Sequence, residues 1–320
     1  MPRAWLLAAL VLGAAPAEAR VFPESPFSDA AAGTTGATFL KIPSGARAQA
    51  MGGAGAAAIE GSEALFWNPA GLAGWDKSSL NELSASYSAL LETSHASALA
   101  FAHPLAEDRG TLGASLLYFS QSEIQGFTTT GDPDGSFAPR DMALSLGYAR
   151  SGERFSAGGA VRVLRSELAG ASGSSFAADF GIRARGVTDI GEGPLDLALC
   201  AQNFGPPIKL GGVSAPLPFV ARGGSLWRVS PRLNGLLDLV LPVDESPYVA
   251  LGGEFHGAIG DSLKGALRAG YNMHNAHKVD GFAGVTAGFG LEVARVRVDY
   301  AWVPLGDLGT THRITIAGRF

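Results

Sequence analysis

Apolar and polar residues alternate with a period of two along most of the chain after Asn81. Between Met142 and Tyr148, large apolar residues occupy every second position, and Ala, Ser or Gly fills the positions between them. This period is typical of β-strands, whose successive side chains point to opposite faces. Helical spacing is nowhere sustained, so the pattern predicts an all-β fold.

The alternating runs are separated by turn residues, and each run predicts one strand. The longest connection is expected at 120–140, where Gly131–Gly135 supplies turn residues. The runs lie at 83–88, 112–118, 142–148, 155–163, 179–184, 195–201, 219–228, 233–241, 249–255, 263–271, 282–291, 296–302 and 313–320.

One face of these strands is apolar, whereas the other carries Gly, Ser and charge. A membrane barrel has this division, because its outer face contacts lipid and its inner face lines a lumen. Unpaired charges inside the core of a soluble sandwich would be very costly. The residues expected to point into the lumen are Arg162, Asp179, Arg183, Arg222, Asp238, Glu254, Arg268, Arg297 and Asp299.

The same period also fits a soluble β-sandwich whose polar face is solvated. Periodicity alone does not separate this alternative, a soluble periplasmic β-protein, from a membrane barrel. Recovery in the outer-membrane fraction and heat-modifiable migration on a gel would exclude the soluble protein.

Composition narrows the class of protein. Glycine accounts for 44 of 320 residues, about twice the usual share, while charged residues make up only 17 %. The net charge of -5 offers no basic surface for phosphates, so no nucleic-acid partner is expected. The single cysteine, Cys200, excludes an intramolecular disulfide, and alternation places it on the inward face of its strand.

Residues 1–19 are expected to be a signal peptide. Arg3 provides the positive region, 5–13 the apolar region, and cleavage is expected after Ala19. The apolar stretch is shorter than the roughly 20 residues of a membrane-spanning helix, which disfavours an anchor. Export and the strand pattern together predict an integral protein of the outer membrane of a Gram-negative-type bacterium.

The barrel is expected to occupy 81–320. With about 9 to 11 residues per spanning strand plus connections, this length fits an even count of twelve to fourteen strands, and fourteen is our prediction. The final strand ends in Phe320, with Ile314 and Ile316 on the same face. This ending resembles the C-terminal signal that the outer-membrane barrel-assembly machinery recognises, although Gly318 stands where an aromatic residue is common.

Residues 20–80 show no strand period. The small-residue stretch at 51–58 is expected to form a short helix packed closely against other backbone, followed by a turn at Pro69–Gly71. Gly53, Gly55 and Ala58 match the spacing of a dinucleotide fingerprint, but the chain has no βαβ pattern to support one. No cofactor is therefore expected.

Two long motifs carry a resemblance to a known family. Residues 45–54 (GARAQAMGGA) with 67–72 (WNPAGL), and residues 299–313 (DYAWVPLGDLGTTHR), resemble the two ends of the PorV/PorQ family of outer-membrane proteins, which is related to FadL-type channels for hydrophobic compounds. The resemblance implies a 14-stranded barrel whose N-terminal segment, 20–80, folds into the lumen as a hatch. The hatch motif would comprise Arg47, Met51, Gly52, Gly53, Trp67, Asn68, Pro69 and Gly71.

The resemblance leaves two functions open. The chain is expected to be an adaptor or receptor for exported proteins, as in type IX secretion. The alternative is a plugged, FadL-like channel for a hydrophobic small molecule, which inward apolar residues such as Leu117 and Leu164 would favour. Both readings imply outer-membrane lipids as surroundings and the barrel-assembly machinery as a partner.

The sequence contains no constellation that predicts an enzyme. A Gly-x-Ser-x-Gly elbow is absent from the sequence. His274 and His277 have a spacing compatible with metal binding, but they are expected in a loop without Cys or carboxylate company. Asp132 and Asp134 lack the remaining ligands of a calcium loop and are interpreted as turn residues.

Overall fold

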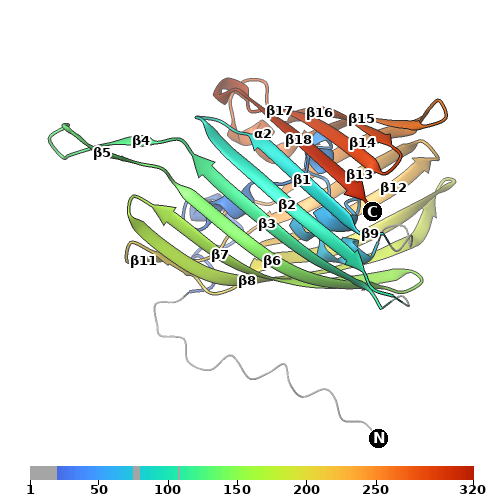
Figure 1. Ribbon diagram of the computed structural model, residues 1–320, viewed down its shortest axis with the longest axis horizontal. Coiled ribbons are helices and arrows are strands. Elements are labelled where there is room, and N and C mark those ends of the chain that lie inside the picture. Colours follow the sequence, from blue (N-terminus) through green and yellow to red (C-terminus); the bar gives the residue numbers. More distant parts are fainter. Residues whose placement is uncertain (1–19, 75–79, 107–108) are drawn as a thin grey trace, which may run out of the picture.

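The structure, a computed structural model, describes residues 20–74, 80–106 and 109–320 (Figure 1). The predicted signal peptide, 1–19, lies outside the described residues. Fourteen antiparallel strands form a closed barrel in which β1 pairs with β18. The predicted all-β barrel with fourteen strands is therefore confirmed.

The barrel strands follow one another around the wall in chain order. The prediction placed the start of one strand too early, because Phe282 lies in the connection before β16. The strands are β1 (Glu82–Ala89), β2 (Ser94–Pro104), β3 (Thr111–Gln121), β6 (Arg140–Ser151), β7 (Phe155–Leu168), β8 (Ala171–Ile190), β9 (Gly193–Phe204), β12 (Val220–Ser230), β13 (Leu233–Pro242), β14 (Tyr248–Ile259), β15 (Leu263–Asn272), β16 (Val285–Val293), β17 (Val296–Pro304) and β18 (Thr310–Arg319).

The two faces of the wall divide as the alternation predicts. Leu144 and Leu146 are exposed on the outside, whereas Ser145 between them is buried. Ring closure pairs each strand with two neighbours, which satisfies the backbone hydrogen-bonding groups of the wall without leaving an open sheet edge. The apolar outside and polar inside are thus properties of one continuous sheet.

The two ends of the barrel differ in their connections. At one end, the turn end, connections are short, as at 191–192, 231–232 and 294–295. The opposite end, the loop end, carries longer connections. These include the hairpin of β4 (Ile124–Phe127) and β5 (Pro133–Phe137), the hairpin of β10 (Ile208–Leu210) and β11 (Val213–Ala215), and the short helix α2 (Met273–Lys278). The β4–β5 hairpin projects well beyond the wall (Figure 1).

Residues 20–74 form short helices joined by turns; 20–34 are mostly exposed at the loop end, and most of 44–74 is buried inside the barrel (Figure 1). We call this segment the hatch. Near its start, Phe27 N donates to Val243 O at the loop end; at its end, Gly74 O accepts from Arg185 Nη2 near the turn end. The hatch elements are η1 (Asp29–Ala31), η2 (Thr38–Lys41), α1 (Ala46–Ala50), η3 (Gly61–Phe66) and η4 (Pro69–Ala73). No helix in the described part of the chain is long and apolar enough to cross a membrane.

The local prediction for the hatch was wrong in two places. The helix of small residues is α1, which ends at Ala50, because Gly52 and Gly53 then take positive φ values of 70° and 84° that a helix does not accommodate. Pro69 begins the 3₁₀ helix η4 instead of a turn. The Asn68 side chain caps that helix by accepting from Ala70 N at 3.0 Å.

Glycines of the wall allow the hatch backbone to approach closely. A Cβ on Gly270 of β15 would lie 2.0 Å from Gly52 N, and a Cβ on Gly158 of β7 would lie 2.5 Å from Pro69 O. Neither distance leaves room for a side chain. One structural use of the high glycine content is therefore to let the hatch backbone pack directly against the backbone of the wall.

Candidate functional site

The first half of the hatch motif is seated against β15 and β16. Gly52 N donates to Thr286 Oγ1 at 2.9 Å, and Gly52 O accepts from Asn272 Nδ2 at 2.8 Å. Met51 is fully buried, and Gly53 N donates to Ala48 O at 2.9 Å, which closes the turn after α1. Gly52 therefore fixes the hatch to the wall through both of its backbone groups.

The second half of the hatch motif packs against strands β6, β7 and β8 of the wall. Trp67 is buried, and its Nε1 donates to Ser44 O at 2.8 Å. Asn68 Nδ2 donates to Ala56 O at 3.0 Å, while Gly71 N donates to Asn68 O at 2.9 Å. The segment therefore holds together through bonds within the hatch itself as well as through contacts with the wall.

Charged residues lock the hatch to the wall toward the turn end. Arg47 of the hatch donates from Nε and Nη2 to the two oxygens of Glu254, each at 2.9 Å. Arg268 bridges Glu254 at 2.7 Å and Asp299 at 2.8 Å. Arg297 continues the chain to Asp299 and to hatch Glu63, both at 2.7 Å. We call these six residues the turn-end latch.

The remaining wall charges also face the lumen. Asp238 Oδ2 accepts from Gly55 N and Ala56 N, both at 2.9 Å. Arg162 pairs with Asp179 at 2.8 Å. Arg183 pairs with Asp196 at 2.9 Å and also contacts hatch Glu60. Arg222 lies over the Trp67 ring, with its guanidinium carbon 5.3 Å from the ring centroid. All nine expected residues thus point inward, at different depths.

Sequence reasoning missed several partners of these charges. Asp196 and Arg313 occupy polar positions of predicted strands, so the same alternation could have found them. Glu60 and Glu63 lie in the hatch, which has no period, and no sequence signal marked them as partners. Cys200 is buried, with Sγ 3.3 Å from Trp67 O, on the inward face that alternation predicted.

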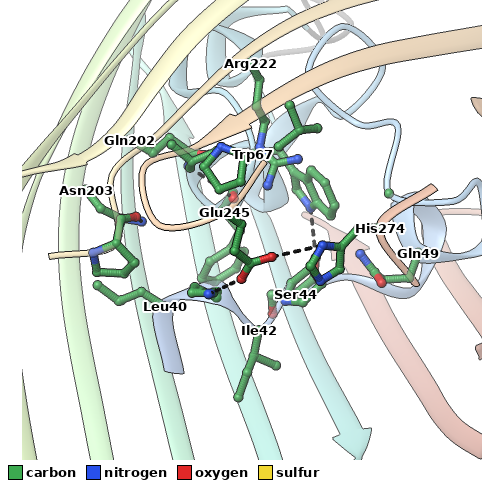
Figure 2. A pocket seen from close by; sticks show the side chains of 18 of the residues that line it. Leu40, Ile42, Ser44, Gln49, Trp67, Gln202, Asn203, Arg222, Glu245 and His274 are labelled. Atoms are coloured by element: carbon green, nitrogen blue, oxygen red, sulfur yellow. Dashed lines mark hydrogen bonds and ion pairs between the residues drawn. The ribbon is translucent and has the colours of Figure 1, made fainter. Parts of the chain in front are cut away.

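Two cavities flank the hatch. The turn-end cavity measures about 900 Å³ and is lined by the latch residues Arg47, Glu254 and Arg268 among others. The loop-end cavity measures about 250 Å³ and lies between the hatch and the strand ends at the loop end (Figure 2). Its lining combines apolar hatch residues such as Leu40 and Ile42 with polar side chains of the wall.

One wall of the loop-end cavity is closed by a charged cluster. Hatch Lys41 pairs with Asp244 at 3.0 Å and also contacts Glu245. Glu245 Oε2 lies 2.9 Å from His274 Nδ1, the contact drawn as a dashed line in Figure 2. The hydrogen bond with His274, with a further one from Lys41, lowers the pKa of Glu245 to about 2 although partial burial opposes the change. This carboxylate therefore stays charged at neutral pH and holds hatch and loop together.

His274 and His277 do not lie in an irregular loop, as expected, but in the short helix α2. His274 also has carboxylate company, from Glu245, contrary to the expectation. His277 Nδ1 instead contacts Met273 O at 2.8 Å. Across 20–74, 80–106 and 109–320, no group of three His, Cys, Asp or Glu side chains is arranged to hold a metal ion.

The last strand presents its apolar residues to the outside. Ile314 and Ile316 are exposed on the outer face of β18, and exposed Phe320 follows the end of the strand at the turn end. Arg313 and Thr315 point inward from the same strand, and Ala46 N donates to Thr315 Oγ1 at 2.9 Å. The final strand therefore both closes the wall and contacts the hatch.

A fourteen-stranded barrel with an N-terminal hatch in its lumen defines a class, the FadL-like outer-membrane barrels. The structure is similar to the Ralstonia pickettii toluene transporter TbuX, with TM-score 0.57 and 14% sequence identity over 86% of this chain and 98% of that one. The P. putida toluene transporter TodX follows with TM-score 0.54, 11% identity, 86% and 98% coverage. A Pseudomonas aeruginosa FadL homologue gives TM-score 0.52, 11% identity, 87% and 98% coverage.

Within this class, the sequence identifies the family. The profile of the PorV family, described as type IX secretion system protein PorV, matches residues 26–196, more than half of the chain. This protein belongs to the PorV family, as its two end motifs led us to expect. No curated protein sequence matches the chain. The family is described as a type IX secretion system protein, and TbuX and TodX are described as toluene transporters.

Proposed function

We propose that this protein is an outer-membrane adaptor that receives exported proteins in a type IX-like secretion pathway. The observation that carries the proposal is the family match, which spans the hatch and the strands β1 to β8. The loop end would face the exterior, because outer-membrane barrels carry their longer connections there. Exported proteins would be received at that end.

The closed lumen supports an adaptor over an open pore. The hatch crosses the barrel from the loop end to the turn end, and the latch places Arg47 and Glu63 in buried ion pairs with the wall. The wall offers no lateral gap at β3, which keeps one register with β2 and with β6 along its length. A cargo protein would therefore act on the outer surfaces and loops of this barrel, not pass through it.

The outward residues of β18 take a role in biogenesis under this proposal. Ile314, Ile316 and Phe320 would be the part of the chain that the barrel-assembly machinery binds. Replacing Phe320 with Ser would then lower the amount of heat-modifiable barrel in the outer membrane. The same replacement at Phe127, in the β4–β5 hairpin, is the matched control and would leave the amount unchanged.

Gene deletion tests the adaptor role. Proteins that share one C-terminal domain should disappear from the medium of the deletion strain, and expression of the intact barrel should restore them. A variant lacking 124–137, the β4–β5 hairpin, separates loss of the barrel from loss of a docking element. An unchanged set of proteins in the medium of the deletion strain would contradict the proposal.

A second function has its own supporting observation. The loop-end cavity presents Leu40, Ile42, Leu117 and Val240, so a plugged channel for a hydrophobic small molecule stays the alternative. Leu164, expected with Leu117, is buried under Phe39 and Leu217 and does not line the cavity. Mass spectrometry of the barrel purified in mild detergent separates the functions. Exported proteins favour the adaptor, and apolar small molecules without protein partners favour the channel.

A further inference from the structure

Two arginines of the loop-end cavity have no carboxylate partner. Arg313 of β18 is only 6% exposed; its Nη1 donates to Pro43 O at 2.9 Å, and its buried Nε has no hydrogen-bond partner. The buried Nε of Arg222 on β12 also lacks a partner. In the described part of the chain, neither residue forms an ion pair.

Other arginines that point into the lumen do form ion pairs. Arg162, Arg183, Arg268 and Arg297 each pair with at least one carboxylate. Asp238 is the inward acid on β13, the strand next to that of Arg222. Its Oδ2 accepts hydrogen bonds from two hatch N–H groups, and it makes no ion pair with Arg222. Because a buried cation without a counter-charge is costly, these two guanidinium groups mark an unmet capacity to bind an anion.

Trp67 brings the two arginines to one neighbourhood. Arg222 lies over its ring, and Trp67 Nε1 donates to Ser44 O. Arg313 donates to the carbonyl of Pro43, the residue next to Ser44. Figure 2 shows Arg222 beside Trp67 in the same cavity. Donors from two strands that lie far apart around the barrel, β12 and β18, therefore line one cavity.

The cavity also restricts the anion by charge and size. A guanidinium fork matches carboxylate or phosphate, but Asp244 and Glu245 on the same lining would repel a multiply charged group. The volume of about 250 Å³ lies below the range of roughly 300 to 1,000 Å³ that is usual for drug-sized ligands. Leu40 and Ile42, which are both partly exposed, offer an apolar surface. We propose that the loop-end cavity binds a compact organic monocarboxylate, held by Arg313 and Arg222 with its apolar body against Leu40 and Ile42.

Calorimetric titration of the full purified barrel tests this site. Benzoate should bind at least about tenfold more tightly than benzyl alcohol, which has the same ring without the charge. Arg222→Gln and Arg313→Gln should each weaken benzoate binding about tenfold and leave benzyl alcohol unaffected. Arg165→Gln, at an exposed arginine of β7 paired with Glu167, is the matched control and should change neither affinity.

The carboxylate could belong to a free acid or to the end of a polypeptide. A tripeptide with a free C-terminal carboxylate and the same tripeptide amidated distinguish the two sources. Binding of benzoate supports a free acid, and binding of the free tripeptide alone supports a chain terminus. If Arg313→Gln fails to fold, Arg222→Gln and the pairs of charged and uncharged ligands still test whether the cavity binds a carboxylate.

Three results would overturn the proposal. These are equal affinity for the charged and the uncharged ligand in both pairs, no binding of benzoate or free tripeptide at millimolar concentration, and tighter binding of inorganic phosphate than of any carboxylate. The titration uses the isolated barrel and reads no secreted protein. Its failure is therefore distinct from failure of the secretion role.

Discussion

The turn end and the loop end of the lumen use the same residue types in opposite ways. In the turn-end latch, Arg47, Arg268 and Arg297 are each paired with carboxylates at 2.7 to 2.9 Å. In the loop-end cavity, Arg222 and Arg313 are inward and buried or half-buried, yet neither has a carboxylate within ion-pair distance in the described residues. The turn-end latch pairs its arginines internally, whereas the loop-end cavity leaves these two arginines without an ion pair, although Lys41 and Arg162 of the same cavity are paired.

The difference shows that charged residues pointing into a barrel can have two different roles. A network whose cations and carboxylates pair with one another fixes the hatch to the wall, so it serves structure. An arginine beside a cavity without a counter-charge lowers stability unless something binds it, so it serves recognition. Three substitutions and one change of pH distinguish these two roles, with progressively smaller expected effects.

Glu254→Gln should have the largest effect. It removes the charge shared by Arg47 and Arg268, so two buried arginines lose a partner, and the free energy of unfolding should fall by about 3–5 kcal/mol. Denaturant unfolding in detergent measures this loss. Lys264→Met breaks the exposed pair with Glu292 and is the control, with an expected loss of about 0–1 kcal/mol. Equal losses in the two variants would mean that the latch is not a structural lock.

Gly270→Val should unseat the hatch while the wall still closes. The new side chain would meet Gly52 N and the Met51 backbone, and overpacking of this kind costs about 1–3 kcal/mol or more. We expect protease cleavage within residues 44–74, which are mostly buried in the unchanged protein, of a barrel that remains heat-modifiable. Gly253→Val, on the neighbouring strand, meets no atom within 4 Å and should leave the hatch protected.

Joint replacement of Asn68 and Pro69 by Ala should loosen the middle of the hatch. The change removes the cap of η4 and the bond to Ala56 O, and loss of such a cap costs about 1 kcal/mol. Conductance in planar bilayers should rise as the hatch opens more often. Ser28→Ala, which removes the corresponding cap of η1, is the control. Unchanged conductance in the double variant would show that this segment is not the gate.

Lowering the pH should have the smallest effect on stability, through Glu245 at the loop end. The pKa of Glu245 is about 2 in the folded protein, below its ordinary value of 4.5, so its contribution is complete above pH 4.5 and disappears as the pH falls toward 2. Because Glu245 is half-buried, solvent screening keeps the contribution small. The melting temperature of the Glu245→Gln variant should therefore lie below that of the wild type at pH 7 and converge with it near pH 2. A constant difference over this range would contradict the assignment.

The wall could be predicted from the sequence because alternation is a local property. Runs such as Met142–Tyr148 place each residue inside or outside without reference to any other strand. The inward position of Asp179 or Arg268 follows from the same rule. What the rule lacks is depth along the lumen and the identity of the partner across it.

The position of the hatch in the chain could be predicted from its motif, but its local structure could not. The positive φ values at Gly52 and Gly53 end α1 before the stretch in which a helix was expected. Glu60 and Glu63 meet Arg183 and Arg297, more than a hundred residues away, only because the barrel closes around them. Whether Arg313 has an ion-pair partner likewise depends on which residues the closed barrel brings near it. The alternating sequence around Arg313 resembles that of the other strands and does not reveal this.

The course of the hatch bears on the order of assembly. The chain enters the lumen contacts at the loop end, with Phe27 on Val243, and leaves them at the turn end, with Gly74 on Arg185. A segment of this kind would have to be threaded lengthwise through a ring that was already complete. Seam formation between the first strand, β1, and the last, β18, can avoid that passage if it comes after the hatch is in place. The join between the two chain ends is then the step at which the barrel encloses its own plug.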